Sequence, residues 1–158
     1  MKKENEIVVF GATGFSGQFV AEFLAETYET NFCISGRSET KLKSLQEKIE
    51  KKFKKKIPII IASIQDEKSI FSLCSSSKIL INCVGPFEKF GEIVVKNCIE
   101  NNCHYLDITG EPSFIKRIIK KYDDEAKKKG VLVIPCCGID SVPADLGVLV
   151  NHSFLIFF

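Results

Sequence analysis

IVVFGATGFSG, residues 7–17, joins an apolar run to a glycine-rich turn, and QFVAEFLAETYETNFCISGRS continues the chain to residue 38. Apolar residues recur after the turn at positions 19, 20, 23 and 24, as on one face of a helix. A strand, a glycine turn and a helix in this order predict a dinucleotide-binding unit. Gly11 permits the turn, Gly14 lets the backbone approach a pyrophosphate at the helix N-terminus, and Gly17 allows close helix packing. Thr13 occupies the place of the usual second glycine, so a turn that binds nothing stays open as an alternative.

Arg37 follows the next β-prone run, about 20 residues past the last glycine. In the dinucleotide-binding sequence pattern, the residue at this place contacts the ribose of the adenosine half. An acid at this place would accept hydrogen bonds from the free 2′-hydroxyl of NAD. A guanidinium instead suits a 2′-phosphate, because its donors meet the phosphate oxygens in a bidentate geometry. The sequence therefore predicts that NADP(H) is preferred over NAD(H). The alternative is an arginine that is simply solvated at the surface.

The composition excludes several classes of protein. The 158 residues suffice for about one domain, and 45% hydrophobic with 27% charged residues is typical of globular proteins. A net charge of +2 argues against a nucleic-acid partner. Seven cysteines without zinc spacing predict no metal site and indicate buried thiols of a reducing, intracellular compartment, taken as the cytoplasm. No apolar run reaches the roughly 18 residues of a transmembrane span, and the charged residues 1–6 leave no room for a signal peptide.

Strand-like and helix-like segments alternate along the rest of the chain. We expect strands at residues 7–10, 31–35, 57–62, 79–84, 105–108 and 131–134, with helices at 39–53, 66–74 and 91–101 and another beginning at Pro112. The run at 57–62 is continuously apolar, which is typical of a strand buried on both faces. This alternation predicts an α/β fold, a doubly wound parallel sheet (Rossmann) with strand order 3-2-1-4-5-6. The ligand crevice then lies at the carboxyl ends of the strands.

Six stretches carry a family resemblance: residues 10–17, SGR at 35–37 with KL at 41–42, NCVGPF at 82–87, GE at 91–92, DITGE at 107–111 and GIDSVPADLG at 138–147. On these stretches the chain resembles the saccharopine dehydrogenase-like oxidoreductases and is similar also to the trans-acting enoyl reductases of glycolipid synthesis. The resemblance implies that the glycine turn and Arg37 hold NADP and that residues 82–86 pass beside the nicotinamide ribose. It also implies a larger C-terminal substrate domain, which we expect to be missing here.

The residues expected to bind the cofactor are Gly11, Thr13, Gly14, Phe15, Ser16, Gly17, Arg37, Ser38, Ser63, Asn82, Val84, Gly85 and Pro86. Ser63 departs from the family, which tends to place an acid near the adenine after the third strand. The serine hydroxyl could accept the same hydrogen bond. Residues 151–158 match nothing in the family, so we expect an NADP-binding domain at 1–150 followed by an aberrant or truncated apolar tail.

The predicted activity is hydride transfer on an unidentified substrate, lipid-linked by the resemblance, in a chain that is not catalytically complete. Asp107, Glu111, Asp140 and His104 are the acids and bases near strand ends, and none is assigned a catalytic role. No tyrosine has a lysine four residues on, which disfavours the short-chain dehydrogenases. The alternative function is a non-catalytic NADP(H)-sensing or scaffold protein. By resemblance we expect peripheral lipid association at a droplet or membrane surface, and exposed apolar surface would favour a homo-oligomer.

Overall fold

The computed structural model describes residues 3–27, residue 29 and residues 31–156, and for residues 154–156 it describes the backbone alone. The strands are β1 (Asn5–Phe10), β2 (Phe32–Gly36), β3 (Ile59–Ile61), β4 (Ser77–Asn82), β5 (His104–Asp107) and β6 (Val133–Ile134). The helices are α1 (Phe15–Thr27), α2 (Glu39–Phe53), α3 (Glu67–Ser76), α4 (Phe87–Glu100), α5 (Pro112–Lys129) and α6 (Val142–Ile156). Strands and helices alternate as the sequence predicts.

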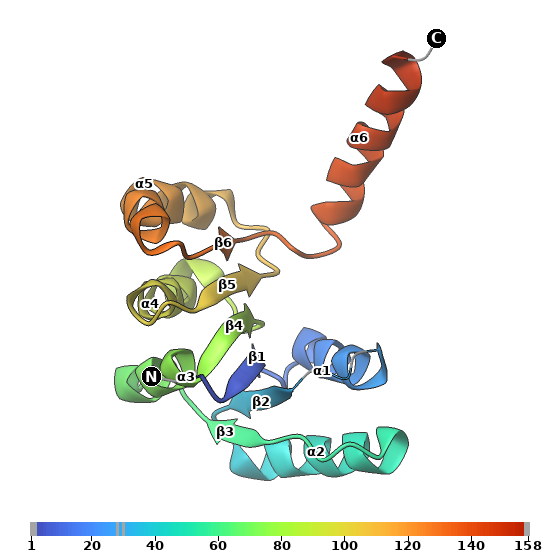
Figure 1. Ribbon diagram of the computed structural model, residues 1–158, viewed down its shortest axis with the longest axis vertical. Coiled ribbons are helices and arrows are strands. Elements are labelled where there is room, and N and C mark those ends of the chain that lie inside the picture. Colours follow the sequence, from blue (N-terminus) through green and yellow to red (C-terminus); the bar gives the residue numbers. More distant parts are fainter. Residues whose placement is uncertain (1–2, 28, 30, 157–158) are drawn as a thin grey trace.

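The described strands form one parallel sheet in the order β3-β2-β1-β4-β5-β6, which confirms the predicted doubly wound fold (Figure 1). Successive side chains of β1 enter different cores, because they point to opposite faces of the sheet. Val8 packs with residues of α3, α4 and α5, whereas Val9 packs with residues of α1 and α2. The winding direction reverses between β1 and β4, and this switch point is where ligands bind in such sheets.

The edges of the sheet depart from the prediction. β3 is shorter than the apolar run at 57–62, and the side chain of Ile61 is 47% exposed rather than buried on both faces. The prediction was wrong here because β3 is an edge strand, and Pro58 before it has no N–H to donate. At the other edge β6 is reduced to two residues. The predicted strand order placed both strands at the edges, but the apolar runs overstated the length of both strands and the burial of β3.

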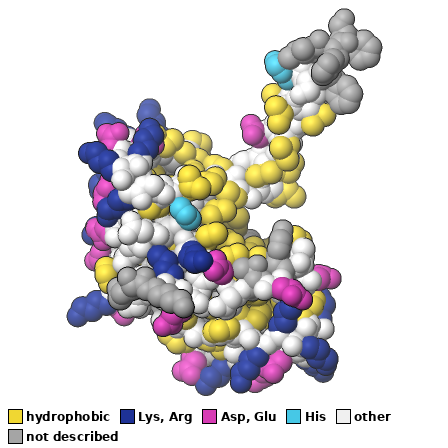
Figure 2. All heavy atoms as spheres, viewed as in Figure 1, with side chains coloured by type: hydrophobic (Ala, Val, Ile, Leu, Met, Phe, Trp, Pro, Cys, Tyr) yellow, Lys and Arg dark blue, Asp and Glu magenta, His cyan; other side chains and the backbone are white. Residues whose placement is uncertain are grey.

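α6 projects away from the sheet and its covering helices (Figure 1). Its exposed valines and leucines give the projecting helix the hydrophobic surface seen in Figure 2. The domain boundary expected after residue 150 falls inside this continuous helix, and residues 157–158 of the expected tail lie outside the described residues. Within the described ranges, no helix is both long and apolar enough to cross a membrane.

All seven cysteines are free thiols. Four of them, Cys33, Cys74, Cys98 and Cys103, are buried, and the sulfurs of Cys74 and Cys98 lie 3.6 Å apart between α3 and α4. Burial raises the pKa of Cys33 to about 12, so this thiol is uncharged at neutral pH. These cysteines therefore pack as small apolar side chains.

Candidate functional site

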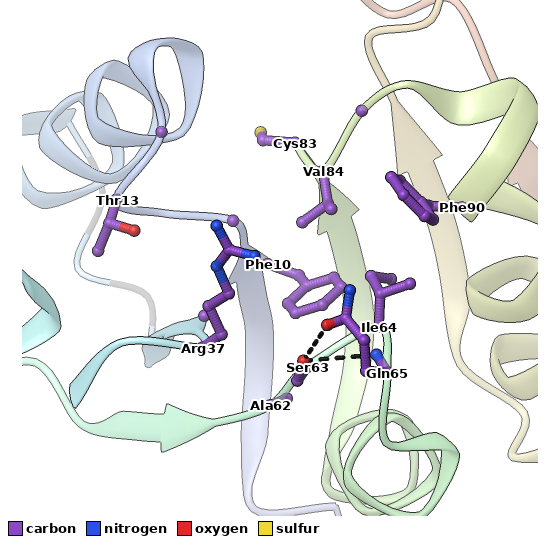
Figure 3. Close-up of a pocket in the computed structure, with 14 residues that line it drawn as sticks. Phe10, Thr13, Arg37, Ala62, Ser63, Ile64, Gln65, Cys83, Val84 and Phe90 are labelled. Carbon is purple, nitrogen blue, oxygen red and sulfur yellow. Dashed lines mark hydrogen bonds between the residues drawn. The ribbon is translucent and has the colours of Figure 1, made fainter.

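A cavity of about 300 Å³ opens at the carboxyl ends of β1, β2, β3 and β4, at the switch point of the sheet (Figure 3). Its lining is Phe10, Gly11, Thr13, Gly14, Gly36, Arg37, Ala62, Ser63, Ile64, Gln65, Cys83, Val84, Gly85 and Phe90. Each of the four strands contributes its last residues or the loop that follows. The sequence placed the crevice at these strand ends, and the cavity lies there.

The glycine turn is shaped by close backbone contacts. Gly11 has a φ of +83°, and a Cβ there would lie 2.7 Å from the Cγ2 of Val84. A Cβ on Gly17 would lie only 2.2 Å from the carbonyl oxygen of Gly11, so α1 packs directly on the turn. Gly14 is exposed, and its nearest neighbour for a Cβ is the same oxygen at 3.2 Å. Gly11 and Gly17 are therefore required by the protein itself, whereas a Cβ on the exposed Gly14 would make one tight contact, with the Gly11 oxygen, and would otherwise face outward at the start of α1.

Arg37 extends into the cavity between Thr13 and Phe10 in the view of Figure 3. Within the described part of the chain, no carboxylate or carbonyl pairs with its guanidinium. Ser38 is the N-cap of α2, and its hydroxyl accepts a hydrogen bond from the amide of Lys41 at 3.4 Å. The guanidinium donors of Arg37 are consequently free to bind an anion, and Ser38 fixes the helix start beside it.

The structure brings seven of the predicted residues together around the cavity: Gly11, Thr13, Gly14, Arg37, Ser63, Val84 and Gly85. Phe15, Ser16, Gly17, Ser38, Asn82 and Pro86 do not line it, and the ring of Phe15 is 81% exposed on α1. Sequence reasoning missed several lining residues, chiefly Gln65 and Phe90, whereas Cys83 lies within the stretch 82–86 that the resemblance placed beside the nicotinamide ribose. Gln65 lies two residues beyond Ser63 in a loop that leaves β3 toward the crevice, which was the one signal available for it.

Asn82 lies in a buried polar network rather than in the cavity wall. Its Nδ2 donates to the hydroxyl of Tyr105 at 3.1 Å, and that hydroxyl donates to the Oδ2 of Asp107 at 2.8 Å. The Oδ1 of Asn82 accepts from the amide of Val84 at 3.0 Å. Asn82 thereby fixes the loop after β4, which forms one wall of the cavity.

Asp107 extends this network to two further loops. Its Oδ1 accepts from the amides of Thr109 and Cys136 at 3.0 and 3.1 Å, and its carbonyl accepts from the amide of Cys137 at 2.7 Å. Burial raises the pKa of the Asp107 carboxyl above its ordinary value, although the hydrogen bonds it accepts oppose that shift. Asp107 therefore holds together the loops that follow β4, β5 and β6.

Of the other three candidates, Asp140 is exposed and does not line the cavity, and Glu111 and His104 make structural contacts. The carboxylate of Glu111 accepts from the amides of Phe87 and Glu88 at 2.9 and 2.8 Å and so caps α4, whose N-cap Pro86 offers no side-chain acceptor. Pro86 follows a cis peptide bond from Gly85. His104 lies at the opposite end of β5, where its Nδ1 accepts from the amide of Leu132 at 3.0 Å. Neither side chain lines the cavity.

A doubly wound parallel sheet with a glycine turn and a cavity at its switch point defines a dinucleotide-binding Rossmann domain. Residues 7–134 match the family model of the saccharopine dehydrogenase NADP binding domain. The chain therefore belongs to the saccharopine dehydrogenase-like oxidoreductases, as the sequence motifs predicted, and contains their NADP-binding domain.

Curated relatives agree with this assignment. The chain is 42% identical over 149 residues to the lipid droplet localized protein of Caenorhabditis elegans, matching 90% of this chain and 35% of that protein. It is 41% identical over 159 residues to the saccharopine dehydrogenase-like oxidoreductase of Mus musculus, matching 93% of this chain and 37% of the relative. A trans-acting enoyl reductase of Mycobacterium ulcerans is 31% identical over 93% of this chain and 35% of its own length. The chain thus spans about a third of the length of these relatives.

Among solved structures, the chain resembles apo saccharopine dehydrogenase (L-Glu forming) from Saccharomyces cerevisiae, with a TM-score of 0.70 and 18% identity. The likeness covers 86% of this chain and 28% of the yeast chain. At this identity it supports the fold alone.

Proposed function

We propose that the chain binds NADP(H) in the cavity at the switch point, prefers it to NAD(H), and serves as the cofactor-binding part of a hydride-transferring oxidoreductase. The observation that carries the proposal is Arg37, whose guanidinium extends into the cavity and has no partner among the described residues. A 2′-phosphate would supply the oxygens that these donors lack, and NAD has no such group.

The rest of the cavity fits a dinucleotide. The turn from Gly11 to Gly17 presents the N-terminus of α1, which suits a pyrophosphate. Thr13 and Ser63 line the cavity and offer hydroxyl groups, and Ser38 lies next to Arg37 at the start of α2. On the β4 side, the residues proposed to lie next to the nicotinamide ribose are Asn82, Val84, Gly85 and Pro86. Asn82 acts through the backbone amide of Val84, which it holds by a hydrogen bond. The bound cofactor would supply or accept the hydride.

Groups that transfer protons are scarce in this cavity. Arg37 and Cys83 are the ionisable residues of its lining, and burial raises the pKa of Cys83 to about 11. A reaction that needs a proton donor at neutral pH would require a group from outside the cavity. This observation supports a binding part that is not catalytically complete, and it also favours the second candidate, a non-catalytic NADP(H)-sensing or scaffold protein.

The substrate proposed for the oxidoreductase is lipid-linked. Two relatives support this class by their names, which describe a lipid droplet localized protein and a trans-acting enoyl reductase. The exposed apolar side chains of α6 are consistent with peripheral lipid association or with a homo-oligomer. The chain as it stands, incubated with NADPH and a panel of carbonyl and enoyl lipids, should show no saturable NADPH oxidation. Turnover by a monomer would contradict the proposal of an incomplete site.

The cofactor preference is tested by calorimetric titration of NADPH and NADH. A hydrogen-bonded charged group contributes roughly 1.5 to 3 kcal/mol, so NADPH should bind at least about tenfold more tightly than NADH. Arg37→Asp should remove this difference. Lys68→Asp is the control, since it changes the net charge equally at an exposed residue outside the cavity. Equal affinities of the unmodified protein for the two cofactors would overturn the preference.

A further inference from the structure

Ser63 and Gln65 form a hydrogen-bonded pair at the rim of the cavity, on the side of β3. The hydroxyl of Ser63 donates to the Oε1 of Gln65 at 2.5 Å and accepts from the Gln65 amide at 3.4 Å (Figure 3). The backbone of Ser63 is held in turn, because its amide donates to the Oγ of Ser69 at 3.0 Å. The pair is therefore part of a defined turn between β3 and α3.

The carboxamide of Gln65 offers an unused donor and an unused acceptor to the cavity. Gln65 lines the cavity together with Ile64 and Phe10, which are labelled in Figure 3. Its Oε1 keeps one lone pair after accepting from Ser63, and no hydrogen bond in the described part of the chain uses its Nε2. Because Ser63 donates to Oε1, the oxygen and the nitrogen of the carboxamide have a defined orientation.

The position of the pair relates it to one end of a dinucleotide. Arg37 and Ser63 follow the neighbouring strands β2 and β3, so a base attached to the 2′-phosphorylated ribose lies on this side of the cavity. Adenine presents an amino donor next to a ring-nitrogen acceptor, and a carboxamide complements this pair of groups with two hydrogen bonds. Ile64, which is partly buried and lines the same cavity, adds apolar surface for one face of a base.

We propose that Gln65 reads the Watson–Crick edge of the adenine base, with Oε1 accepting from the adenine amino group and Nε2 donating to the adjacent ring nitrogen N1. The proposal rests on the proposed binding of NADP(H) in this cavity. Ser63 then acts as a positioning residue, since its hydroxyl orients the carboxamide. An acidic side chain after β3 could also accept a hydrogen bond from the adenine amino group. In this chain the uncharged Ser63 and Gln65 would serve that purpose.

A dinucleotide that carries hypoxanthine in place of adenine distinguishes hydrogen bonding by Gln65 from simple stacking of the base. Hypoxanthine has a carbonyl oxygen where adenine has the amino group, and its N1 carries a proton. A carboxamide must turn over to match it, and the Ser63 hydroxyl then loses its acceptor on Gln65. The protein should consequently bind NADPH about five- to tenfold more tightly than the reduced nicotinamide hypoxanthine dinucleotide phosphate, the scale of about one hydrogen bond.

The experiment titrates both dinucleotides into the unmodified protein, Gln65→Leu, Ser63→Ala and the control Lys68→Leu. Gln65→Leu should weaken NADPH binding about fivefold or more, weaken binding of the hypoxanthine analogue by less, and bring the ratio of the affinities close to one. Ser63→Ala should lower the ratio in the same direction, and Lys68→Leu should leave it unchanged. Because Gln65 is exposed, the melting temperatures of the variants should match that of the unmodified protein.

Different results separate this inference from the proposed function. If the unmodified protein binds NADPH but shows a ratio of one, or if Gln65→Leu weakens both dinucleotides equally, base reading by Gln65 is overturned and NADPH binding stands. If the unmodified protein binds no NADPH, the proposed function fails and the inference fails with it.

Discussion

Replacing Tyr105 by phenylalanine should destabilise the fold and loosen the cavity wall at once. Tyr105 is fully buried, and its hydroxyl joins the Nδ2 of Asn82 at 3.1 Å to the Oδ2 of Asp107 at 2.8 Å. Tyr105→Phe leaves both groups buried without this partner. A buried group left unsatisfied costs about 1 to 3 kcal/mol, so with two such groups the free energy of unfolding should fall by roughly 2 to 6 kcal/mol.

The assay is urea unfolding followed by circular dichroism, with NADPH titration of the folded variant alongside. Tyr122→Phe is the matched control, since its hydroxyl donates to the Oε1 of Glu92 at 3.1 Å, and Glu92 keeps Lys121 and Arg117 as partners. The control should lose less than about 1 kcal/mol. We expect NADPH affinity to fall for Tyr105→Phe alone, because Asn82 holds the loop that contains Val84. A loss of stability below about 0.5 kcal/mol would refute the view that the network fixes these loops.

Two glycines of one turn should respond differently to an added side chain. Gly17→Ala places a Cβ 2.2 Å from the Gly11 carbonyl oxygen and should lower the unfolding free energy by roughly 1 to 3 kcal/mol or more, whereas Gly14→Val should keep the α/β circular dichroism spectrum and abolish NADPH binding. Normal affinity in Gly14→Val would mean that the turn is structural only. Acid should also destabilise the protein, because the hydrogen bond from Lys121, followed by those from Tyr122 and Arg117, lowers the pKa of Glu92 below its ordinary value of 4.5. The stabilisation by Glu92 is present above pH 4.5 and is lost as the pH falls through the pKa of Glu92 in the folded state, whereas buried Asp107, whose pKa is raised, acts in the opposite direction. The melting temperature between about pH 7 and pH 3 should therefore fall less steeply in Glu92→Gln than in the unmodified protein. Identical pH profiles of the two proteins would contradict this role of Glu92.

The sheet could be predicted from the sequence because each central strand is an apolar run bounded by glycine or polar residues. The strand order followed from the alternation of strands and helices. The edge strands were harder, since apolar composition does not say whether a neighbour will cover the run. Ile61 shows this, as its side chain is apolar and still 47% exposed.

The candidate site could be predicted only where local backbone chemistry decides it. The glycine turn and Arg37 have fixed spacings along the chain, and both line the cavity. Gln65 could not be found in this way, because its orientation depends on a hydrogen bond from Ser63 and on the position of the loop after β3. The helix start at Phe87 was also missed, since its cap is Glu111, which lies 24 residues further along the chain.

The stretches that resemble the family owe their residue types mainly to the loops they support. A chain that leaves the end of a parallel strand has amide groups that no neighbouring strand accepts, and a buried amide needs an acceptor. Asn82 accepts from Val84, Asp107 accepts from Thr109, and Glu111 accepts from Phe87. Each of these side chains serves the backbone of the loops around the cavity, on its β4 and β5 side. A carboxylate in these motifs is thus explained without assigning it a proton-transfer role.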